Sequence, residues 1–135
     1  MQYIEIEPTY KSPQVIFDPS KGKFTIAGKS VLVNVEEFYG PLLSWMDEFL
    51  EQSELNEVEF TFDIEYYNLA STKRFVFFLY KLKEVQKKGG KLKVNWLYRN
   101  QDTDILEMGQ DLSQMLELPF NFRGYEKLHK KVSAN

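Results

Sequence analysis

The residues best suited to chemistry stand between Asn68 and Lys73. This segment, Asn-Leu-Ala-Ser-Thr-Lys, combines an amide, two adjacent hydroxyls and a cation, and it connects an alternating strand to an amphipathic helix. Free backbone amides and the helix dipole at a helix N-terminus favour an anion, including a phosphoryl group on a nearby hydroxyl. Lys73 and Arg74 are suited to pair with such a group. The simpler explanation is that Ser71 only caps the helix.

Carboxylates form a second cluster at the start of an expected helix over residues 103–116. Its members are Asp102, Asp104, Glu107 and Asp111. Oxygen ligands suit a hard cation, but acidic residues in a first helical turn also complement the helix dipole, and their spacing matches no calcium loop. We therefore expect no metal there. Asp102, Asp104 and Glu107 are instead a candidate surface for binding a protein partner.

Residue sets for nucleophilic or phosphate chemistry are missing from the sequence. The chain has no cysteine, and its single histidine, His129, stands in a lysine-rich terminal segment. Ser-His-Asp and Cys-His arrangements are therefore excluded from the ordered part, as are disulfides and thiolate metal sites. Gly89-Gly90 follows a helix, whereas a phosphate-binding glycine loop precedes one. An enzyme would need carboxylate or metal chemistry from Asp63, Glu65 and the Asp102 cluster, so we expect no catalytic residues and no cofactor.

Composition bounds the class of protein. The chain has 135 residues, of which 43% are hydrophobic and 16% aromatic, enough for one domain with a dense core. A net charge of -3 does not favour nucleic acid, which usually binds a basic face. No apolar run is long enough for membrane insertion. The N-terminus lacks the basic start and apolar stretch of a signal peptide, so a cytoplasmic location is the default expectation.

Alternating apolar and polar residues predict five strands. They cover residues 2–7, 14–17, 23–27, 57–66 and 91–98. Asp18-Pro19-Ser20-Lys21-Gly22 separates the second strand from the third and predicts a hairpin. Residues 57–66 have one apolar face and one acidic face, which indicates a sheet covered mainly on one side, or an edge strand. An edge strand would also let two copies pair as a homodimer.

Helical spacing predicts three helices. In the first, Asn34 and Glu37 form a capping box, and the helix continues through Pro41 to about residue 52 or 53. The second follows a turn over residues 67–71 and ends at Lys87-Lys88-Gly89-Gly90. The third covers residues 103–116 and is stopped by Pro119.

These elements predict the fold class and the domain boundaries. The strand, helix and strand between residues 57 and 98 form a βαβ unit with a right-handed connection. We therefore expect an α/β protein with a mixed sheet, an N-terminal hairpin, a βαβ unit and about three helices packed on the sheet. Residues 1–123 would form the single domain, and residues 124–135, polar and lysine-rich, a flexible C-terminal tail.

Four segments together resemble the SiaC family of bacterial regulatory phosphoproteins. They are residues 38–45 (Phe-Tyr-Gly-Pro-Leu-Leu-Ser-Trp), 66–73 (Tyr-Tyr-Asn-Leu-Ala-Ser-Thr-Lys), 94–98 (Val-Asn-Trp-Leu-Tyr), and 106–109 (Leu-Glu-Met-Gly) running on to 118–120 (Leu-Pro-Phe). Residues 17–20 and 24–28 are similar too, so the likeness covers nearly the whole chain. It implies a fold like the STAS domain of anti-sigma-factor antagonists, and a protein without catalysis of its own.

The resemblance also implies protein partners. In this family a cognate serine/threonine kinase phosphorylates a hydroxyl in the strand-to-helix turn, and a phosphatase removes the phosphate. The unmodified form binds and activates a diguanylate cyclase, which raises cyclic di-GMP and shifts cells toward aggregation or biofilm. The expected function is therefore that of a signalling adaptor.

One position departs from the family pattern. The family's turn has Asn-Thr-Ser-Ser and its threonine takes the phosphate, whereas this chain has Asn68, Leu69, Ala70 and Ser71. Three outcomes stay open: phosphorylation has moved to Ser71 or Thr72, the protein is locked in its unmodified form, or it has another role. Each helical residue turns about 100°, so a hydroxyl further along points elsewhere, which favours the locked form. An exposed Leu69 would add to a partner interface.

A second class of function stays open beside the adaptor. The aromatic residues near the strand ends would line a pocket in a small-molecule or nucleotide-binding sensor. These residues are Tyr66, Tyr67, Trp96 and Tyr98. Alternation places Tyr66, Trp96 and Tyr98 on the core-facing side, so core packing is the simpler explanation for them.

Overall fold

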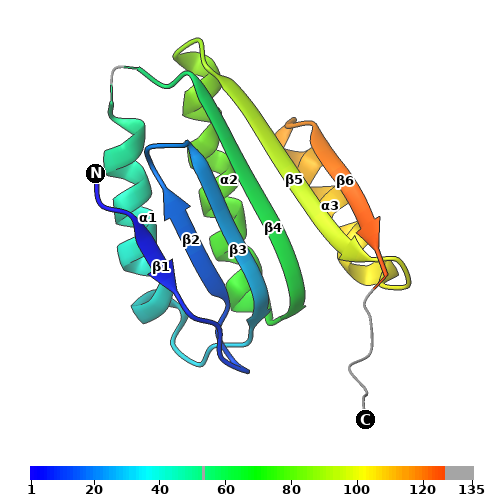
Figure 1. Cartoon of the computed structure of the whole chain (residues 1–135). Coiled ribbons are helices and arrows are strands. Elements are labelled where there is room, and N and C mark those ends of the chain that lie inside the picture. Colours follow the sequence, from blue (N-terminus) through cyan, green and yellow to red (C-terminus); the bar gives the residue numbers. More distant parts are fainter. Residues whose placement is uncertain (53, 127–135) are drawn as a thin grey trace.

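Six strands form one sheet in chain order. The computed structural model describes residues 1–52 and 54–126 (Figure 1). The strands are β1 (Ile4–Ile6), β2 (Gln14–Asp18), β3 (Lys23–Ser30), β4 (Glu57–Tyr67), β5 (Lys91–Arg99) and β6 (Phe120–Tyr125). The β1-β2-β3 part is antiparallel, and β3 to β6 run parallel. The predicted hairpin and mixed sheet are confirmed.

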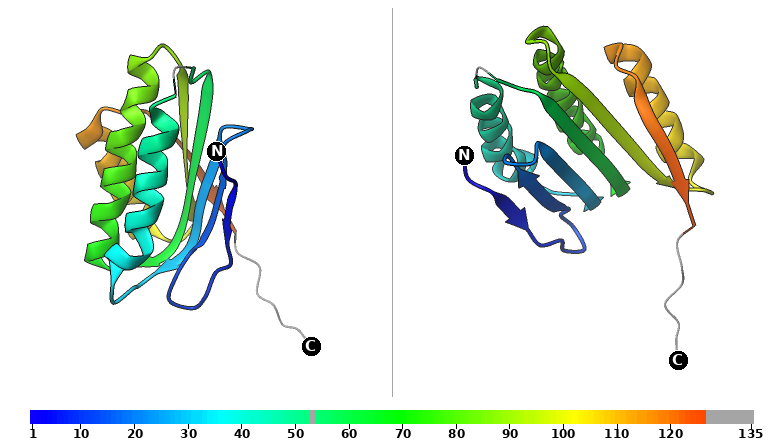
Figure 2. Two further views of the ribbon diagram at one scale, coloured as in Figure 1. Left: turned by 90° about the vertical axis from the view of Figure 1, so that its left-hand side faces the viewer. Right: turned by 45° about the horizontal axis from the view of Figure 1, so that its top comes forward.

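Three helices connect the parallel strands and cover one face of the sheet (Figure 2). They are α1 (Val35–Leu50), α2 (Leu69–Lys87) and α3 (Thr103–Leu116). Each crossover is β-α-β between neighbouring parallel strands, and such connections are right-handed. Because the strands advance in one direction, all three helices fall on the same side. No helix among the described residues is long and apolar enough to span a membrane.

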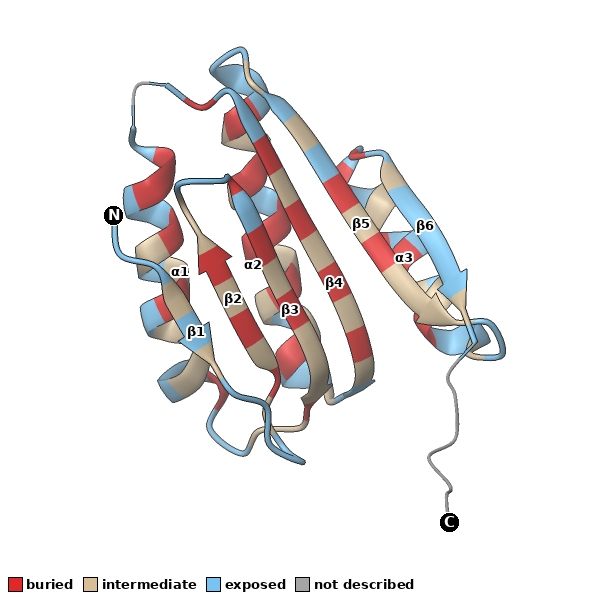
Figure 3. Ribbon diagram, in the orientation of Figure 1, coloured by how far each residue is buried: buried red, intermediate tan, exposed pale blue. Residues whose placement is uncertain are grey.

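The core lies between this face and the helices and is rich in aromatic rings. Buried and half-buried residues alternate along β2, β3 and β4 (Figure 3). The ring centroid of Phe60 in β4 lies 4.8 to 6.0 Å from those of four other rings, which belong to Phe17, Phe24, Phe62 and Phe78. Such pairs add about 0.5–1.5 kcal/mol each beyond the burial of their surface.

The opposite face of the sheet is polar, and the acidic side of β4 lies on it. Asn95 of β5 donates to Glu59 Oε2 at 2.7 Å and to Thr61 Oγ1 at 3.0 Å. The Tyr125 hydroxyl donates to Asp63 Oδ1 at 2.7 Å. The acidic face predicted for this strand is therefore held by neighbours in the sheet.

The position of β4 settles the alternatives that its pattern left open. The strand lies between β3 and β5, so the sheet covered on one side is confirmed and the edge position is wrong. Both of its backbone edges are used within the sheet. The edge position on which a homodimer through β4 depended is therefore excluded, because the strand lies inside the sheet.

The sequence predicted no sixth strand. Strand β6 pairs with β5 from Val94↔Phe120 to Arg99↔Tyr125. It begins directly after Pro119, whose predicted role is to stop the preceding helix. The boundary expected between residues 123 and 124 falls inside this strand. The rest of the expected tail, residues 127–135 with His129, lies outside the described residues.

Helix α2 provides hydrogen bonds for the ends of both neighbouring helices. Neither α1 nor α3 has a basic residue in its own last turn. Lys83 Nζ donates to the Leu116 carbonyl at 2.9 Å, and Lys88 Nζ, just beyond α2, donates to the carbonyls of Leu50 and Gln52. These bonds satisfy carbonyls that a helix end leaves unpaired. Helix α1 thus ends at Leu50, slightly before the predicted residue 52 or 53.

Helix α3 packs closely on β5 because residue 109 has no side chain. A Cβ at Gly109 would collide with the Trp96 indole, whose Nε1 donates to the Ile105 carbonyl at 2.9 Å. We expect Gly109→Ala to lower the free energy of unfolding by about 1–3 kcal/mol, since overpacking forces the ring and helix apart. Urea unfolding monitored by tryptophan fluorescence measures this.

Gly40→Ala in α1 is the matched control for this prediction. A Cβ there would meet only the flexible end of Glu36, and alanine favours a helix interior over glycine by about 1 kcal/mol. This variant should be at least as stable as the parent chain. Equal stability of the two alanine variants would contradict the close packing of α3 on Trp96.

Candidate functional site

The N-termini of α2 and α3 lie at the same edge of the sheet. Each follows a parallel strand, β4 or β5, so both begin at the carboxyl ends of the strands, where α/β proteins place their sites. We call residues 68–73 the regulatory turn. Thr72 Oγ1 of this turn lies 4.0 Å from Met108 Sδ of α3, so the two helix starts are in contact.

Asn68 is the cap of α2. Its Oδ1 accepts from the Ser71 amide at 3.0 Å, and its Nδ2 donates to the Leu32 carbonyl at 2.9 Å. The Asn68 amide donates to the Ser30 carbonyl at 3.0 Å. Helix α2 therefore begins at Leu69 rather than after a turn over residues 67–71. The prediction that Ser71 caps this helix is wrong, because Ser71 lies inside its first turn.

The Ser71 hydroxyl is fully buried and belongs to a chain of hydroxyl groups. Ser30 Oγ donates to Ser71 Oγ at 2.7 Å and lies 2.6 Å from the Tyr39 hydroxyl. A hydroxyl has one hydrogen, so Tyr39 must donate to Ser30. Ser71 Oγ in turn has the Ser30 carbonyl at 2.8 Å and Asn68 Oδ1 at 2.7 Å as acceptors. We call Tyr39, Ser30 and Ser71 the hydroxyl relay.

The hydroxyl relay connects three elements of the fold. Ser30 ends β3, Tyr39 belongs to α1 and Ser71 to α2, and all three residues have no exposed surface. Burial raises the pKa of Tyr39 to about 12. The relay fixes the regulatory turn to the core through neutral hydrogen bonds.

The remaining residues of the regulatory turn differ in accessibility. Leu69 is 85% exposed, and Ala70 and Lys73 are also exposed. Thr72 is half-buried, and its Oγ1 lies 3.4 Å from the Asn68 carbonyl. Of the two hydroxyls considered as phosphorylation sites, Ser71 is therefore inaccessible to a kinase in this conformation, whereas Thr72 is partly accessible.

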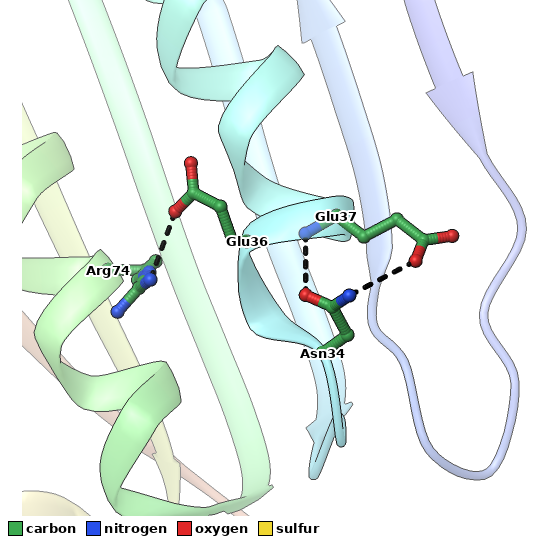
Figure 4. A network of polar contacts seen from close by, with 4 residues as sticks. All are labelled: Asn34, Glu36, Glu37 and Arg74. Atoms are coloured by element: carbon green, nitrogen blue, oxygen red, sulfur yellow. Dashed lines mark hydrogen bonds and ion pairs between the residues drawn. The ribbon is translucent and has the colours of Figure 1, made fainter.

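The two cations considered as phosphate partners also differ. Arg74 forms an ion pair with Glu36 of α1 at 3.0 Å (Figure 4), and its guanidinium lies 5.8 Å from the centre of the Phe77 ring. Lys73 has no ion pair within the described residues. Lys73 is thus available at the turn, while Arg74 holds α2 against α1.

The predicted capping box of α1 lies beside this ion pair. Asn34 Oδ1 accepts from the Glu37 amide at 3.1 Å, as expected (Figure 4). The Glu37 carboxylate accepts from Asn34 Nδ2 at 3.3 Å rather than from the Asn34 backbone. The reciprocal bond is therefore between side chains.

The acidic cluster of α3 divides into a cap and an exposed pair. Asp102 Oδ1 accepts from the Ile105 amide at 3.0 Å, which makes Asp102 the N-cap. Asp104 and Glu107 are exposed. No group of three or more metal-ligating side chains occurs in residues 1–52 and 54–126. Asp104 and Glu107 thus stay candidates for partner binding, while Asp102 is engaged in the helix.

The aromatic residues of the sensor hypothesis do not share a pocket. Trp96 is fully buried, whereas Tyr66 and Tyr67 are exposed at the end of β4. The core-facing position predicted for Tyr66 is wrong, because alternation fails where the register with β3 shifts between Gly28 and Lys29. Trp96 instead serves packing against α3.

The carboxylates of the enzyme hypothesis are both engaged on the uncovered sheet face. Asp63 accepts from Tyr125, and Glu65 pairs with Arg99. Burial, followed by the contact with Asp63, raises the pKa of Tyr125 to about 12. These side chains join β4 to β5 and β6 rather than to the Asp102 cluster.

Sequence reasoning missed Ser30 and Tyr39. Ser30 falls on the core-facing side of its strand, in line with Phe24 and Ile26. A polar residue at such a position needs a hydrogen-bonding partner. That pattern was the available signal, although it does not identify Ser71, which is 41 residues away.

Comparison with known proteins gives consistent results. A family model described as SiaC family regulatory phosphoprotein matches residues 6–125. An uncharacterized protein of Pseudomonas aeruginosa strain UCBPP-PA14 is 22% identical over 127 residues, which cover 94% of this chain and 100% of the relative.

Solved structures from Pseudomonas aeruginosa share the fold. The crystal structure of apo-SiaC matches with a TM-score of 0.79 and 21% identity, and the match covers 92% of this chain and 100% of the apo-SiaC chain. A second match comes from the crystal structure of the diguanylate cyclase SiaD in complex with its activator SiaC. It has a TM-score of 0.82 and 22% identity, and it covers 90% of this chain and 99% of the matched chain. The STAS-like α/β architecture predicted from sequence thus agrees with that of the matched structures.

The relay predicts how stability depends on pH. The pKa of Tyr39 is about 12 in the folded chain, and the ordinary value for tyrosine is 10.0. Between these two pH values the unfolded chain binds fewer protons at this residue than the folded chain, so stability falls as pH rises. The loss attributable to Tyr39 is about 2–3 kcal/mol, at about 1.4 kcal/mol per pKa unit. Tyr39→Phe should remove this part of the decline, measured by urea unfolding between pH 9 and about 12.

Tyr80→Phe, which changes an exposed tyrosine, is the control for this experiment. It should retain the alkaline decline of the parent chain. An unchanged decline in Tyr39→Phe would show that the buried hydroxyl of the relay is not the group that titrates.

Proposed function

The chain belongs to the SiaC family of regulatory phosphoproteins, and we propose that it is a non-enzymatic signalling adaptor that binds and activates a diguanylate cyclase. The observation that carries the proposal is the match of the family model to residues 6–125, which include the whole regulatory turn. A relative of the same fold, SiaC of Pseudomonas aeruginosa, is the activator of the cyclase SiaD. A cytoplasmic location and a role in cyclic di-GMP signalling form part of the proposal.

The regulatory turn supports a locked, unmodified state. The position that carries threonine in the family is Leu69, which is exposed and has no hydroxyl to accept a phosphate. Ser71 is held inside the hydroxyl relay, and Thr72 is half-buried against α3. We therefore propose that the chain stays in its unmodified, binding-competent form even where a kinase of the family is active.

Two surfaces beside the turn are available to a partner. One is the acidic pair of α3, Asp104 and Glu107, whose role in partner binding stays a prediction. The other is the outer side of α2. The acidic pair lies at the edge of the sheet that also holds the turn, and the outer side of α2 begins at that edge.

Phosphorylation is tested by intact mass after incubation with ATP and a serine/threonine kinase that modifies a threonine-bearing relative. The chain should gain no phosphate, because position 69 lacks a hydroxyl. Leu69→Thr should gain one, and Leu69→Val, which has the shape of threonine without its hydroxyl, should gain none. A phosphate on the parent chain, traced by Ser71→Ala and Thr72→Ala, would mean that the switch has moved.

Cyclase activation is tested by the rate at which purified diguanylate cyclases of the source organism form cyclic di-GMP. One of them should be activated by the parent chain equally with and without kinase and ATP. Activation by Leu69→Thr should fall after kinase treatment, whereas activation by Leu69→Val should not. No change in rate for any of the cyclases would contradict the proposed function.

A further inference from the structure

Strand β6 forms an open edge of the sheet. It pairs with β5 on one side, and no other described strand pairs with it (Figure 1). Residues 121–124 of this strand are all exposed (Figure 3), and the side chain of Phe122 is 38% exposed. An uncovered strand edge presents unpaired amide and carbonyl groups, which are suited to pairing with another chain.

The two edges of the sheet differ in how they are protected. Strand β1 at the opposite edge has only three residues, with Glu5 at its centre and Pro8 shortly after it. Short strands, charges and prolines all hinder pairing with another chain. Strand β6 has six residues, no proline and a single charge, Arg123, and no bulge interrupts its pairing with β5. It is therefore the edge better suited to accept a further strand.

One hydrogen bond determines which backbone groups of β6 point outward. The Tyr125 carbonyl accepts from the Asn100 amide, just after β5, at 2.8 Å, so the backbone of Tyr125 faces β5. Successive residues of a strand direct their amides and carbonyls to opposite edges. The backbone groups of residues 120, 122 and 124 therefore point away from β5.

A second copy of β6 fits this edge when it runs antiparallel with Phe122 opposite Phe122. All outward residues then lie in hydrogen-bonded pairs, because Phe120 of each copy faces Gly124 of the other. Each such pair exchanges two hydrogen bonds, so the three pairs form about six. Moving the axis by one position would place Asn121 or Arg123 opposite itself and leave an outward residue of each strand unpaired.

The side chains also match in this register. Phe122 pairs with Trp96, whose buried ring faces the helices, so Phe122 lies on the helix-covered side of β6. The two Phe122 rings meet at the axis as a cross-strand aromatic pair. Phe120 lies opposite Gly124 of the second copy, where an aromatic ring covers the surface that glycine leaves open. The pairing thus buries apolar surface that a single chain exposes.

The charge of this edge suits a second copy although the chain carries a net charge of -3. Residues 118–125 contain no carboxylate. The register places Arg123 opposite Asn121 of the other copy rather than opposite itself. Asn121 Nδ2 donates to Asn95 Oδ1 at 3.5 Å, so the Asn121 Oδ1 atom is the acceptor for the guanidinium of the second copy.

Helix α3 brings little negative charge near the second copy. Met108 contacts α2, and the glycine after it packs on β5, so Gln110 lies on the side away from α2. Leu106 and Ser113, both uncharged, share that side. The acidic residues within the helix lie elsewhere on its surface, and only the C-cap, Glu117, is charged on this side.

We propose that this protein forms a symmetric dimer in which the β6 strands of two copies pair antiparallel. The pairing joins two six-stranded sheets into one continuous sheet, with both helix layers on the same face. The two sheets run in opposite directions, so the regulatory turns lie at opposite ends of the dimer and stay uncovered. The inference does not depend on the proposed function.

Sedimentation equilibrium of the full chain measures the dissociation constant of the dimer. Phe122→Glu should raise this constant by about tenfold or more, because two like charges would face each other at the axis. Tyr3→Glu is the matched control: Tyr3 is a 49% exposed aromatic residue beside the opposite edge strand, and the charge change is the same. It should dimerise as the parent chain does. Circular dichroism confirms that both variants are folded.

Cysteine cross-linking tests the register, and the parent chain has no cysteine to interfere. An equimolar mixture of Asn121→Cys and Arg123→Cys should form a disulfide-linked dimer on mild oxidation. The two positions face each other as a non-hydrogen-bonded pair, with Cα atoms about 4.5 Å apart. Each variant alone should cross-link far less, since identical positions lie more than about 7 Å apart, beyond the reach of a disulfide.

Other results would overturn the inference. A parent chain that sediments as a monomer contradicts the dimer, and if it dimerises only after removal of residues 127–135, that segment is the occupant of the edge. Equal dimerisation of the parent chain and folded Phe122→Glu would place the interface elsewhere. Cross-linking of one cysteine variant alone as readily as of the mixture would rule out the assigned pairing.

Discussion

The handedness of the crossovers is the constraint on which the rest of the structure depends. Three successive β-α-β connections advance across the sheet in one direction, and each is right-handed. All helices must then cover one face, and all helix starts must meet at the carboxyl edge of the parallel strands. The regulatory turn and the acidic start of α3 lie side by side for this reason. The alternation of apolar and polar residues along β4 has the same cause, because one face of the strand packs against the helices and the other does not.

Within this arrangement α2 is the central helix. It holds α1 through Arg74 and Lys81, satisfies the carbonyl ends of both neighbours through Lys83 and Lys88, and is tied to β3 by the hydroxyl relay. In the described part of the chain, the side-chain polar contacts that join one helix to another therefore run through α2 or its flanking residues. Its outer side is left as the surface on which exposed aromatic residues gather.

Sequence patterns predicted the parts of the molecule that local rules determine. The long alternation of β4 predicted its burial as far as Ile64, and the apolar spacing of α3 with the following Pro119 predicted the extent of that helix. Strand β6 was missed, because its residues are mostly exposed and its pairing with β5 is not visible in a short segment. The relay was missed since its residues come from three separate elements. The role proposed for position 69 came from the family resemblance, as no physical pattern distinguishes an exposed leucine at a helix start.

The hydroxyl relay has a consequence for the order in which the protein acquires its shape. It joins residues 30, 39 and 71, so it cannot form until β3, α1 and α2 have all come together. Closing such loops lowers the chain entropy before any contact offsets the cost in free energy. The start of α2 therefore reaches its final geometry only once these three elements have packed together. An incompletely folded chain would present the same residues without the same surface, and a partner that recognises this surface selects for finished molecules.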